Sequence, residues 1–183
     1  MSLTNKDINT LLVLCKQGNQ LAQLEVYNRY QKAMYNIALR IVKDRAEAED
    51  IMQESFITAF SKLDSFKGDA AFGAWLKRIV INNSLTQYRK SSKYVHVSDE
   101  VISEEETNVE GIDEEDYTDV KVKKLLECMG ELHQNYERIL NLHFIEGYDY
   151  EELCDILDIS YSNCRTMISR AKESLRKKLA EAL

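Results

Sequence analysis

Residues 150–178, YEELCDILDISYSNCRTMISRAKESLRKK, contain two short amphipathic helical patterns that are joined by a tight turn. The first pattern has an apolar face, which is formed by Leu153, Cys154, Ile156 and Leu157. The second repeats apolar residues at steps of three and four, as one face of an α-helix requires, at Cys164, Ile168, Ala171, Leu175 and Leu179. Asp158 stands in the break, where aspartate tolerates a left-handed backbone, and Ser160 or Ser162 can cap the helix that follows. The stretch therefore predicts two helices that pack closely across a short turn.

The other face of the second helix carries short polar groups and cations, at Asn163, Arg165, Thr166, Ser169, Arg170 and Lys172. Side chains of these types contact base edges and phosphates in nucleic-acid complexes. Residues 160–183 hold six cations against two acids, in a chain whose formal net charge is −7. The pattern is typical of a helix-turn-helix whose second helix enters a major groove. An ordinary helical hairpin with a solvated basic face is the alternative.

The composition favours a mostly helical protein of one or two domains. The chain has 183 residues, of which 44% are hydrophobic, with no proline and only six glycines. It has no apolar run long enough to cross a membrane, and its first ten residues do not resemble a secretory signal. We therefore expect a cytoplasmic protein without membrane insertion.

The four cysteines are not paired at the two-residue spacing of zinc and redox motifs, so reduced, structural thiols are the favoured interpretation. A zinc site is the alternative, although the spacings match no zinc motif. Its candidate ligands would be Cys128, His133, His143, Cys154 and Cys164. We expect neither a metal nor a cofactor.

Two helices are expected before residue 45. The first runs from Leu3 to Lys16, is capped by Thr4 or Asn5, and ends at Gly18. The second is closed by Asp44 and has apolar residues at helical spacing, namely Leu21, Leu24, Tyr27, Tyr30, Met34, Ile37 and Ile41.

A third helix is expected over residues 45–63, with apolar and acidic residues on different sides. The apolar stripe, predicted to face the core, consists of Ala48, Ile51, Met52, Ser55, Phe56, Ala59, Phe60 and Leu63. The other side carries Glu47, Asp50, Gln53 and Glu54. Acids near a helix start match the helix dipole, so a solvated first turn is the alternative to a binding surface.

Residues 64–72 predict a loop that contains Phe66, and a further helix is expected from about Ala70 to Lys90. Its apolar side consists of Phe72, Trp75, Leu76, Ile79, Val80 and Leu85, and its polar side of Lys77, Arg78, Asn82, Arg89 and Lys90. Aromatic rings interleaved with cations are typical of surfaces that bind single-stranded nucleic acid. The alternative is that Phe72 and Trp75 belong to the core.

The next segment is acidic: residues 91–120 hold eleven acids and one cation. Residues 91–119 also lack helical periodicity. This composition predicts a flexible, self-repelling tether between two domains. A segment that mimics nucleic acid and occupies a basic channel is the alternative. Helical patterns resume at Val120 and continue to Gly147, with apolar residues at Leu125, Leu126, Met129, Leu132, Ile139, Leu140, Leu142 and Phe144.

Two separate stretches together resemble one protein family. Residues 48–83, AEDIMQESFITAFSKLDSFKGDAAFGAWLKRIVINN, look like the second domain of bacterial extracytoplasmic-function sigma factors of the sigma-70 superfamily. Residues 131–179, ELHQNYERILNLHFIEGYDYEELCDILDISYSNCRTMISRAKESLRKKL, look like their fourth domain. The resemblance covers roughly residues 10–180. It implies an all-α fold with a region 2 helical bundle at 1–92, a flexible acidic linker at 93–119, and a region 4 helix-turn-helix at 120–183.

The resemblance also implies a function, which is to direct core RNA polymerase to specific promoters and to assist promoter melting. The residues that would dock on the polymerase clamp helices are Glu47, Asp50, Gln53 and Glu54. The minus-ten element would be bound by Phe66, Trp75, Lys77, Arg78 and Asn82. The minus-thirty-five element would be bound by Ser162, Asn163, Arg165, Thr166, Ser169, Arg170, Lys172 and Arg176. Regulation by a separate anti-sigma factor is expected.

The chain departs from the family pattern at three places. Leu132-His133 stands where Leu-Pro is frequent, Asp158 replaces the turn glycine, and Met167 replaces a basic residue of the recognition helix. The last difference bears on which bases are read.

Two other functions compete with this one. A stand-alone DNA-binding regulator would need only residues 120–183, with residues 1–90 as a sensor or dimerisation domain, and would give Asp50, Gln53 and Glu54 no role. An enzyme is not expected, because the sequence shows no Ser/His/Asp grouping, no phosphate-binding glycine loop and no metal-ligand spacing.

Overall fold

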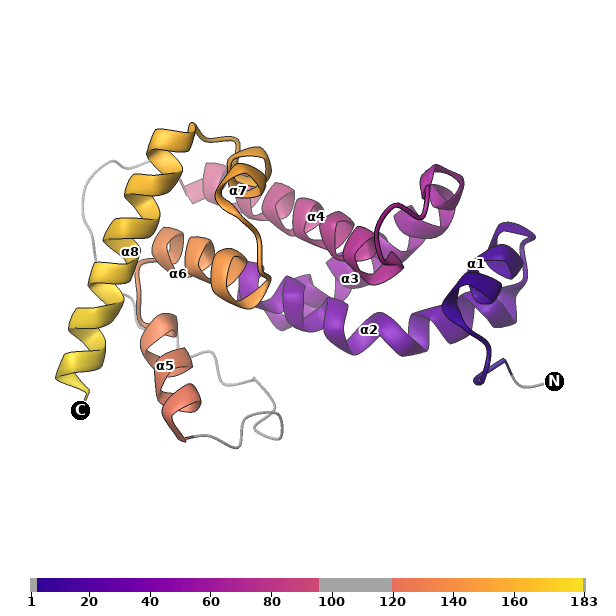
Figure 1. The fold of residues 1–183 in the computed structure, drawn as a ribbon, viewed down its shortest axis with the longest axis horizontal. Helices are drawn as coiled ribbons and strands as arrows, with labels where there is room; N and C mark the ends of the chain where they lie inside the picture. Colours follow the sequence, from indigo (N-terminus) through magenta and orange to yellow (C-terminus); the bar gives the residue numbers. More distant parts are fainter. Residues whose placement is uncertain (1–2, 96–119, 183) are drawn as a thin grey trace. The chain divides into compact units, whose positions relative to one another are not determined.

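The computed structural model describes residues 3–95 and 120–182, and every regular element in these two ranges is helical (Figure 1). The helices form two compact units, one from α1 to α4 and one from α5 to α8. The prediction of an all-α protein is therefore confirmed. Residues 96–119, which contain most of the predicted linker and of the segment that was the candidate mimic of nucleic acid, lie outside the described residues.

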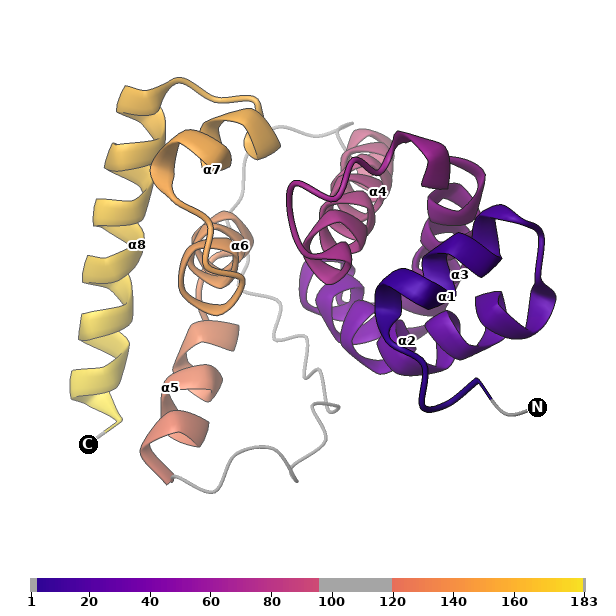
Figure 2. The same cartoon turned by 45° about the vertical axis from the view of Figure 1, so that its right-hand side comes forward.

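The first unit consists of α1 (Ile8–Lys16), α2 (Gln20–Val42), α3 (Arg45–Ser61), the 3₁₀ turn η1 (Leu63–Ser65) and α4 (Phe72–Val95). Helices α2, α3 and α4 pack against one another, and α1 packs against the first half of α2 (Figures 1 and 2). The fully buried side chains at the centre include Leu11, Val26, Leu76, Val80 and Ile81. The predicted stripe of α3 is confirmed as core except for Phe60, which is half-buried.

The sequence patterns placed several helix ends wrongly. Helix α1 begins at Ile8, and its cap is Asp7, which accepts a hydrogen bond from the Thr10 amide. Asp44 does not close α2; Lys43 does, in a left-handed conformation, while Asp44 caps α3 by accepting from the Glu47 amide at 2.8 Å. Helix α4 begins at Phe72 and extends to Val95, three residues into the predicted linker.

The cap of α1 depends on pH. The hydroxyl and amide of Thr10 lower the pKa of Asp7, so the Asp7 cap weakens as the pH falls through the folded pKa.

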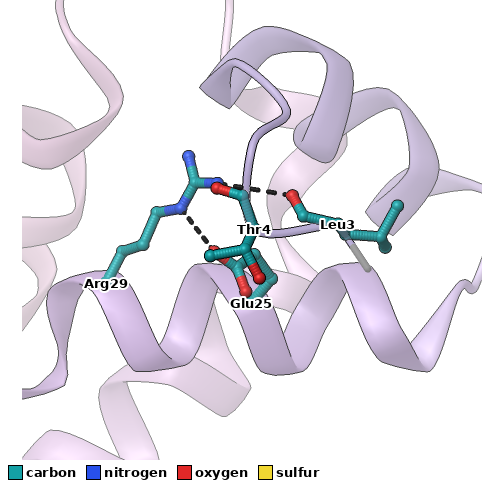
Figure 3. A network of polar contacts seen from close by, with 4 residues as sticks. All are labelled: Leu3, Thr4, Glu25 and Arg29. Atoms are coloured by element: carbon teal, nitrogen blue, oxygen red, sulfur yellow. Dashed lines mark hydrogen bonds and ion pairs between the residues drawn. The ribbon is translucent and has the colours of Figure 1, made fainter. Parts of the chain in front are cut away.

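The first described residues are held against α2 by one arginine (Figure 3). Arg29 donates from Nη2 to the carbonyl oxygens of Leu3 at 3.5 Å and Thr4 at 2.8 Å, while its Nε pairs with Glu25 at 2.8 Å. The sequence pattern had predicted a helix that begins at Leu3. The carbonyls of Leu3 and Thr4 instead bond to a side chain, which explains why no helix begins there.

The second unit consists of α5 (Val120–Gly130), α6 (Gln134–Leu140), the π-helical turn η3 (Asn141–Ile145), α7 (Tyr150–Leu157) and α8 (Tyr161–Glu181). Helix α8 packs against α5, α6 and α7 (Figures 1 and 2). The core side chains with least exposure include Ile139, Leu140, Leu153, Cys164 and Ile168. The helices resume at Val120, as the pattern predicted.

The turn between α7 and α8 confirms the predicted local chemistry. Asp158 has φ 56° and ψ 51°, which is left-handed, and it ends α7. Ser160 caps α8 by accepting from the Asn163 amide at 3.3 Å, so Ser162 is not the cap. A capping box of Asp149 and Glu152 starts α7. The turn is therefore defined by the backbone conformation of Asp158 on one side and the side-chain cap of Ser160 on the other.

The conformation of Asp158 predicts the effect of substitutions there. Asp158→Val should lower the stability of the second unit by about 1–2 kcal/mol, because left-handed backbone is costly for residues with bulky side chains. Asp158→Gly should raise it by about 0.5–1 kcal/mol. Native-state hydrogen exchange of the α7 and α8 amides measures the change.

The matched control is Asp155→Val, the same replacement at an exposed right-handed position of α7. It should change stability by no more than about 0.7 kcal/mol. Equal protection in the Asp155→Val and Asp158→Val proteins would contradict the argument.

Candidate nucleic-acid and polymerase interfaces

The predicted DNA-binding residues of α8 all lie on one side of the helix. With 3.6 residues per turn they occupy about 180° of its circumference, opposite the buried Cys164, Ile168, Ala171 and Leu175. All of them are exposed except Lys172, which is half-buried. We call this surface the recognition face; it consists of Ser162, Asn163, Arg165, Thr166, Ser169, Arg170, Lys172 and Arg176.

Several side chains of the recognition face already have partners. The Thr166 hydroxyl donates to the Ser162 carbonyl at 2.9 Å, and Arg176 pairs with Glu173 at 3.4 Å. Among the described residues, neither Arg165 nor Arg170 forms an ion pair. The two exposed arginines therefore keep their guanidinium groups available for an anionic ligand such as DNA.

The inner side of α8 is held by buried apolar groups and a thiol. Cys164 is fully buried, and its Sγ lies 3.8 Å from the Tyr150 carbonyl oxygen on α7. Burial, and secondarily the neighbouring Cys154, raises the pKa of the Cys164 thiol to about 11. A protonated, buried thiol is unreactive, which agrees with the structural role predicted for the cysteines. In the described part of the chain, no three His, Cys, Asp or Glu residues are grouped so that they could hold a metal ion.

The predicted polymerase-binding residues share one face of α3. Asp50, Gln53 and Glu54 are exposed and Glu47 is half-buried. Only Glu47 belongs to the first turn, where the helix dipole acts, so dipole matching does not explain the acids in the middle of the helix. Gln53 donates to Glu49 at 3.3 Å.

Sequence reasoning missed an apolar residue on the same face. Ile57 is 70% exposed, the highest value among the large hydrophobic residues described as exposed. It follows Asp50 by seven residues and Glu54 by three, which places it on the same face of the helix, about one turn beyond Glu54. The sequence did contain one signal for this residue, because Ile57 is apolar but lies outside the apolar stripe predicted to face the core. We define the acidic face of α3 as Glu47, Asp50, Gln53, Glu54 and Ile57.

An aromatic cluster joins the loop after α3 to α4. The ring of Phe66 lies 5.3 Å from Trp75 and 5.7 Å from Phe72, and Tyr30 of α2 lies 5.5 Å from Phe72. Phe72 is buried, whereas Phe66, Trp75 and Tyr30 are half-buried. The cluster thus combines a core ring with two rings, those of Phe66 and Trp75, that reach the surface where residues 62–72 meet α4.

Helix α4 brings only some of the predicted minus-ten residues together. Trp75, Arg78 and Asn82 lie within about 60° of one another, whereas Lys77 is half-buried and lies about 160° from Trp75. The neighbouring Asn83 has another task, because its amide donates to the buried Ser55 of α3 at 3.0 Å. We call the side of α4 that carries the half-buried Trp75 and the exposed Arg78 and Asn82 the exposed stripe of α4.

Comparison with known proteins connects these surfaces. The family model "Sigma-70 region 2" matches residues 26–94, and the model "Sigma-70, region 4" matches residues 123–175. The ECF RNA polymerase sigma factor SigW of Bacillus subtilis is 29% identical over 178 residues, which cover 91% of this chain and 93% of SigW. SigM of the same organism is 29% identical over 153 residues, covering 83% of this chain and 91% of SigM. The chain belongs to the extracytoplasmic-function sigma factors.

Solved sigma factor structures share the fold. RpoE of Bartonella quintana, in complex with the anti-sigma factor NepR, has a TM-score of 0.60 and 24% identity, covering 85% of this chain and 95% of RpoE. CnrH, in complex with the cytosolic domain of CnrY, has a TM-score of 0.55 and 21% identity, covering 96% of this chain and 99% of CnrH.

This sigma factor is a transcription initiation factor that directs core RNA polymerase to promoters and assists their melting. Such proteins are regulatory factors and not typical enzymes. The acidic face of α3, the aromatic cluster and the exposed stripe of α4 all lie in region 2, and the recognition face lies in region 4. Among the described helices, none combines the length and hydropathy that a membrane span needs.

Proposed function

We propose that this sigma factor assigns three tasks to three surfaces: polymerase docking to the acidic face of α3, minus-ten binding to the aromatic cluster and α4, and minus-thirty-five recognition to the recognition face. Residues 1–92 and 120–183 form its two domains, and residues 93–119 link them. The observation that carries the proposal is the recognition face, because a helix-turn-helix presents uncompensated arginines and short polar groups on the exposed side of its second helix.

The recognition face suits a major groove, which is about 12 Å wide and admits an α-helix. Asn163, Arg165, Thr166 and Ser169 lie toward the start of α8, where a recognition helix contacts base edges. Arg170, Lys172 and Arg176 follow and bind phosphates, which fix register but carry little sequence information. Ser162 lies at the first turn, next to the Ser160 cap.

Docking on core polymerase uses charge and one apolar side chain. Asp50 and Glu54 offer carboxylates to basic groups of the clamp helices, and Gln53 adds an amide. Ile57, about one turn beyond Glu54 on the same face, supplies an apolar contact beside the charged groups, as in many interfaces that combine apolar and charged residues. Glu47 contributes from the edge of the face.

The minus-ten element is bound where the aromatic cluster meets the exposed stripe of α4. Extruding a base from the stack costs a few kcal/mol. Stacking on an aromatic ring returns about 1–3 kcal/mol per base, so Phe66 and Trp75 offset this cost. Asn82 has amide donors and acceptors for the base edge, and Arg78 contacts the backbone. Lys77 was predicted to hold the backbone as well, and its position off the stripe limits it to a peripheral contact.

We also propose that a separate anti-sigma factor regulates this chain, since RpoE and CnrH were both solved with a bound regulator. The sigma factor acts in the cytoplasm, where core polymerase is found. It has no catalytic activity of its own and requires no cofactor.

The test compares the free chain with the holoenzyme on one promoter. The duplex is selected by holoenzyme, assembled with core polymerase of the same organism, from a library with randomised upstream sequence. The holoenzyme should bind it about 100-fold or more tightly than the free chain, because polymerase tethers two weak DNA-binding units. Anisotropy titration measures both affinities.

A free chain that binds the selected duplex as tightly as the holoenzyme does would contradict the proposal. Together with failure to bind core polymerase, that result would identify a stand-alone regulator.

A further inference from the structure

The π-helical turn η3 places an aromatic ring on the surface of region 4. Phe144 belongs to the apolar residues that the sequence places at helical spacing before Gly147, yet it is 52% exposed. The Glu146 amide bonds to the Asn141 carbonyl at 3.0 Å, a five-residue step that rotates the following side chains out of the α-helical register. Single π turns inside helices are frequent at functional sites.

The Phe144 ring lies against a histidine that has further partners. His143 lies beside it with a ring-centroid distance of 4.9 Å, and the His143 ring also lies 5.2 Å from the Tyr150 ring. The Nδ1 atom of His143 is hydrogen-bonded to the Tyr148 carbonyl oxygen at 2.8 Å. Phe144 therefore projects from a turn in which the neighbouring His143 has both ring contacts and a hydrogen bond.

Lys172 of α8 reaches this ring. Its Nζ lies 5.1 Å from the ring centroid of Phe144, within the range of a cation–π interaction. Lys172 is also the half-buried member of the recognition face, whose other members are exposed. It lies two turns beyond Arg165 and within about 20° of it around the helix, so it borders the surface that faces DNA.

We propose that Phe144 is a positioning residue for promoter binding, which holds the Lys172 ammonium where it contacts a DNA phosphate beside the groove. This rests on the proposed function of the recognition face. A lysine that is already ordered loses less side-chain freedom when it binds. The ring covers one side of the ammonium group, and an ammonium has three N–H donors, so the side away from the ring remains free for a phosphate oxygen.

The experiment is a double-mutant cycle in the holoenzyme, with the selected duplex as probe and with salt varied. Lys172→Ala should weaken binding about fivefold and reduce the log–log salt slope by about 0.9, the contribution of one phosphate contact. Phe144→Leu, which keeps an apolar side chain without a ring, should weaken binding about two- to fivefold. Phe144→Tyr should restore wild-type affinity.

The double variant Phe144→Leu/Lys172→Ala should bind no more weakly than Lys172→Ala alone. A merely structural role of Phe144 would instead lower affinity by the same factor in both backgrounds, and this result would overturn the proposal. Wild-type affinity of Phe144→Leu would overturn it too. Phe144→Met, which keeps similar volume, replaces Phe144→Leu if thermal unfolding shows that the leucine protein is destabilised.

Arg165→Ala separates this proposal from the function on which it rests. If Arg165→Ala weakens promoter binding and Phe144→Leu does not, only the positioning role is wrong. If Arg165→Ala and Lys172→Ala both bind the duplex as the wild type does, the recognition face does not bind DNA and both proposals are wrong.

Discussion

Replacing Asp50, Gln53 and Glu54 together by alanine is expected to lower affinity for core RNA polymerase by about 100-fold or more, which corresponds to the loss of one strong interface hot spot. All three side chains are exposed on α3, so the variant should keep its fold. The only hydrogen bond recorded for these side chains in the described part of the chain is the one from Gln53 to Glu49. Stability should therefore change by no more than about 0.5 kcal/mol.

The matched control removes the same number of acids elsewhere in region 2. Asp64→Ala/Asp69→Ala deletes two exposed carboxylates from residues 63–71, outside the acidic face. Asp64 makes only a 3.9 Å pair with Lys16, and its side chain is 94% exposed, so its loss has little effect on the fold.

Titration of a fluorescently labelled chain with core polymerase distinguishes the outcomes. Loss of binding in the triple variant but not in the control locates the docking surface on α3. Equal losses in both would mean that net charge, and not this face, attracts polymerase. Unchanged binding of the triple variant would refute the docking assignment and favour a surface that the sequence did not indicate.

The parts of the fold that sequence predicted well are those decided within a few residues. The buried side of α8 follows directly from apolar spacing, and the turn before it follows from Asp158 and Ser160, because both act on their own backbone neighbours. The recognition face follows from the same periodicity, because it lies opposite the apolar side of α8 that packs against α5, α6 and α7.

The errors arose where distant residues decide the local structure. The segment before Asp7 looked helical, but the Arg29 side chain binds the carbonyls of Leu3 and Thr4. Leu21 and Leu24 have core-like spacing and yet are 62% and 54% exposed, because α2 turns Ala22 and Val26 inward. Which of two adjacent registers is buried depends on the neighbouring helices, and the local pattern does not contain that information.

The candidate site shows the same division. The position of Lys77 could have been deduced, since helical periodicity alone separates it from Trp75 and Asn82. The exposure of Phe144 could not have been deduced. Residues 141–145 fit an α-helical pattern, and the π turn becomes visible only in the hydrogen bonds. Ile57 lies between these cases: its position outside the apolar stripe was evident, but its high exposure was not.

Replacing Trp75 by alanine is expected to reduce promoter opening about tenfold or more, while leaving the first, closed binding step nearly unchanged. Trp75 is the aromatic cluster member that shares the exposed stripe of α4 with Arg78 and Asn82. Phe72 would be a poor choice, because it is 4% exposed and its truncation would open a core cavity. Permanganate reactivity of unpaired thymines in the minus-ten region measures opening, and anisotropy measures closed binding.

Trp75→Phe serves as the control, because it keeps an aromatic ring for a base to stack on. It should retain most of the opening activity, whereas Trp75→Ala should not. Trp75 also touches Phe66 and Phe72, so thermal unfolding of both variants must be compared with the wild type.

A promoter with mismatched, already unpaired bases in the minus-ten region distinguishes two roles of Trp75, which are to stack on an extruded base and to support the fold. On this template the few kcal/mol needed to unstack and unpair the bases are no longer required. If Trp75 acts by stacking on an extruded base, Trp75→Ala should start transcription from the mismatched template at a rate within about threefold of the wild type, although it fails on the paired duplex. If Trp75 only keeps Phe66 and α4 in place, the defect should be equal on both templates, because a disturbed surface cannot bind the single strand either. Equal defects would therefore assign Trp75 to the core and leave base capture to Phe66 and Asn82.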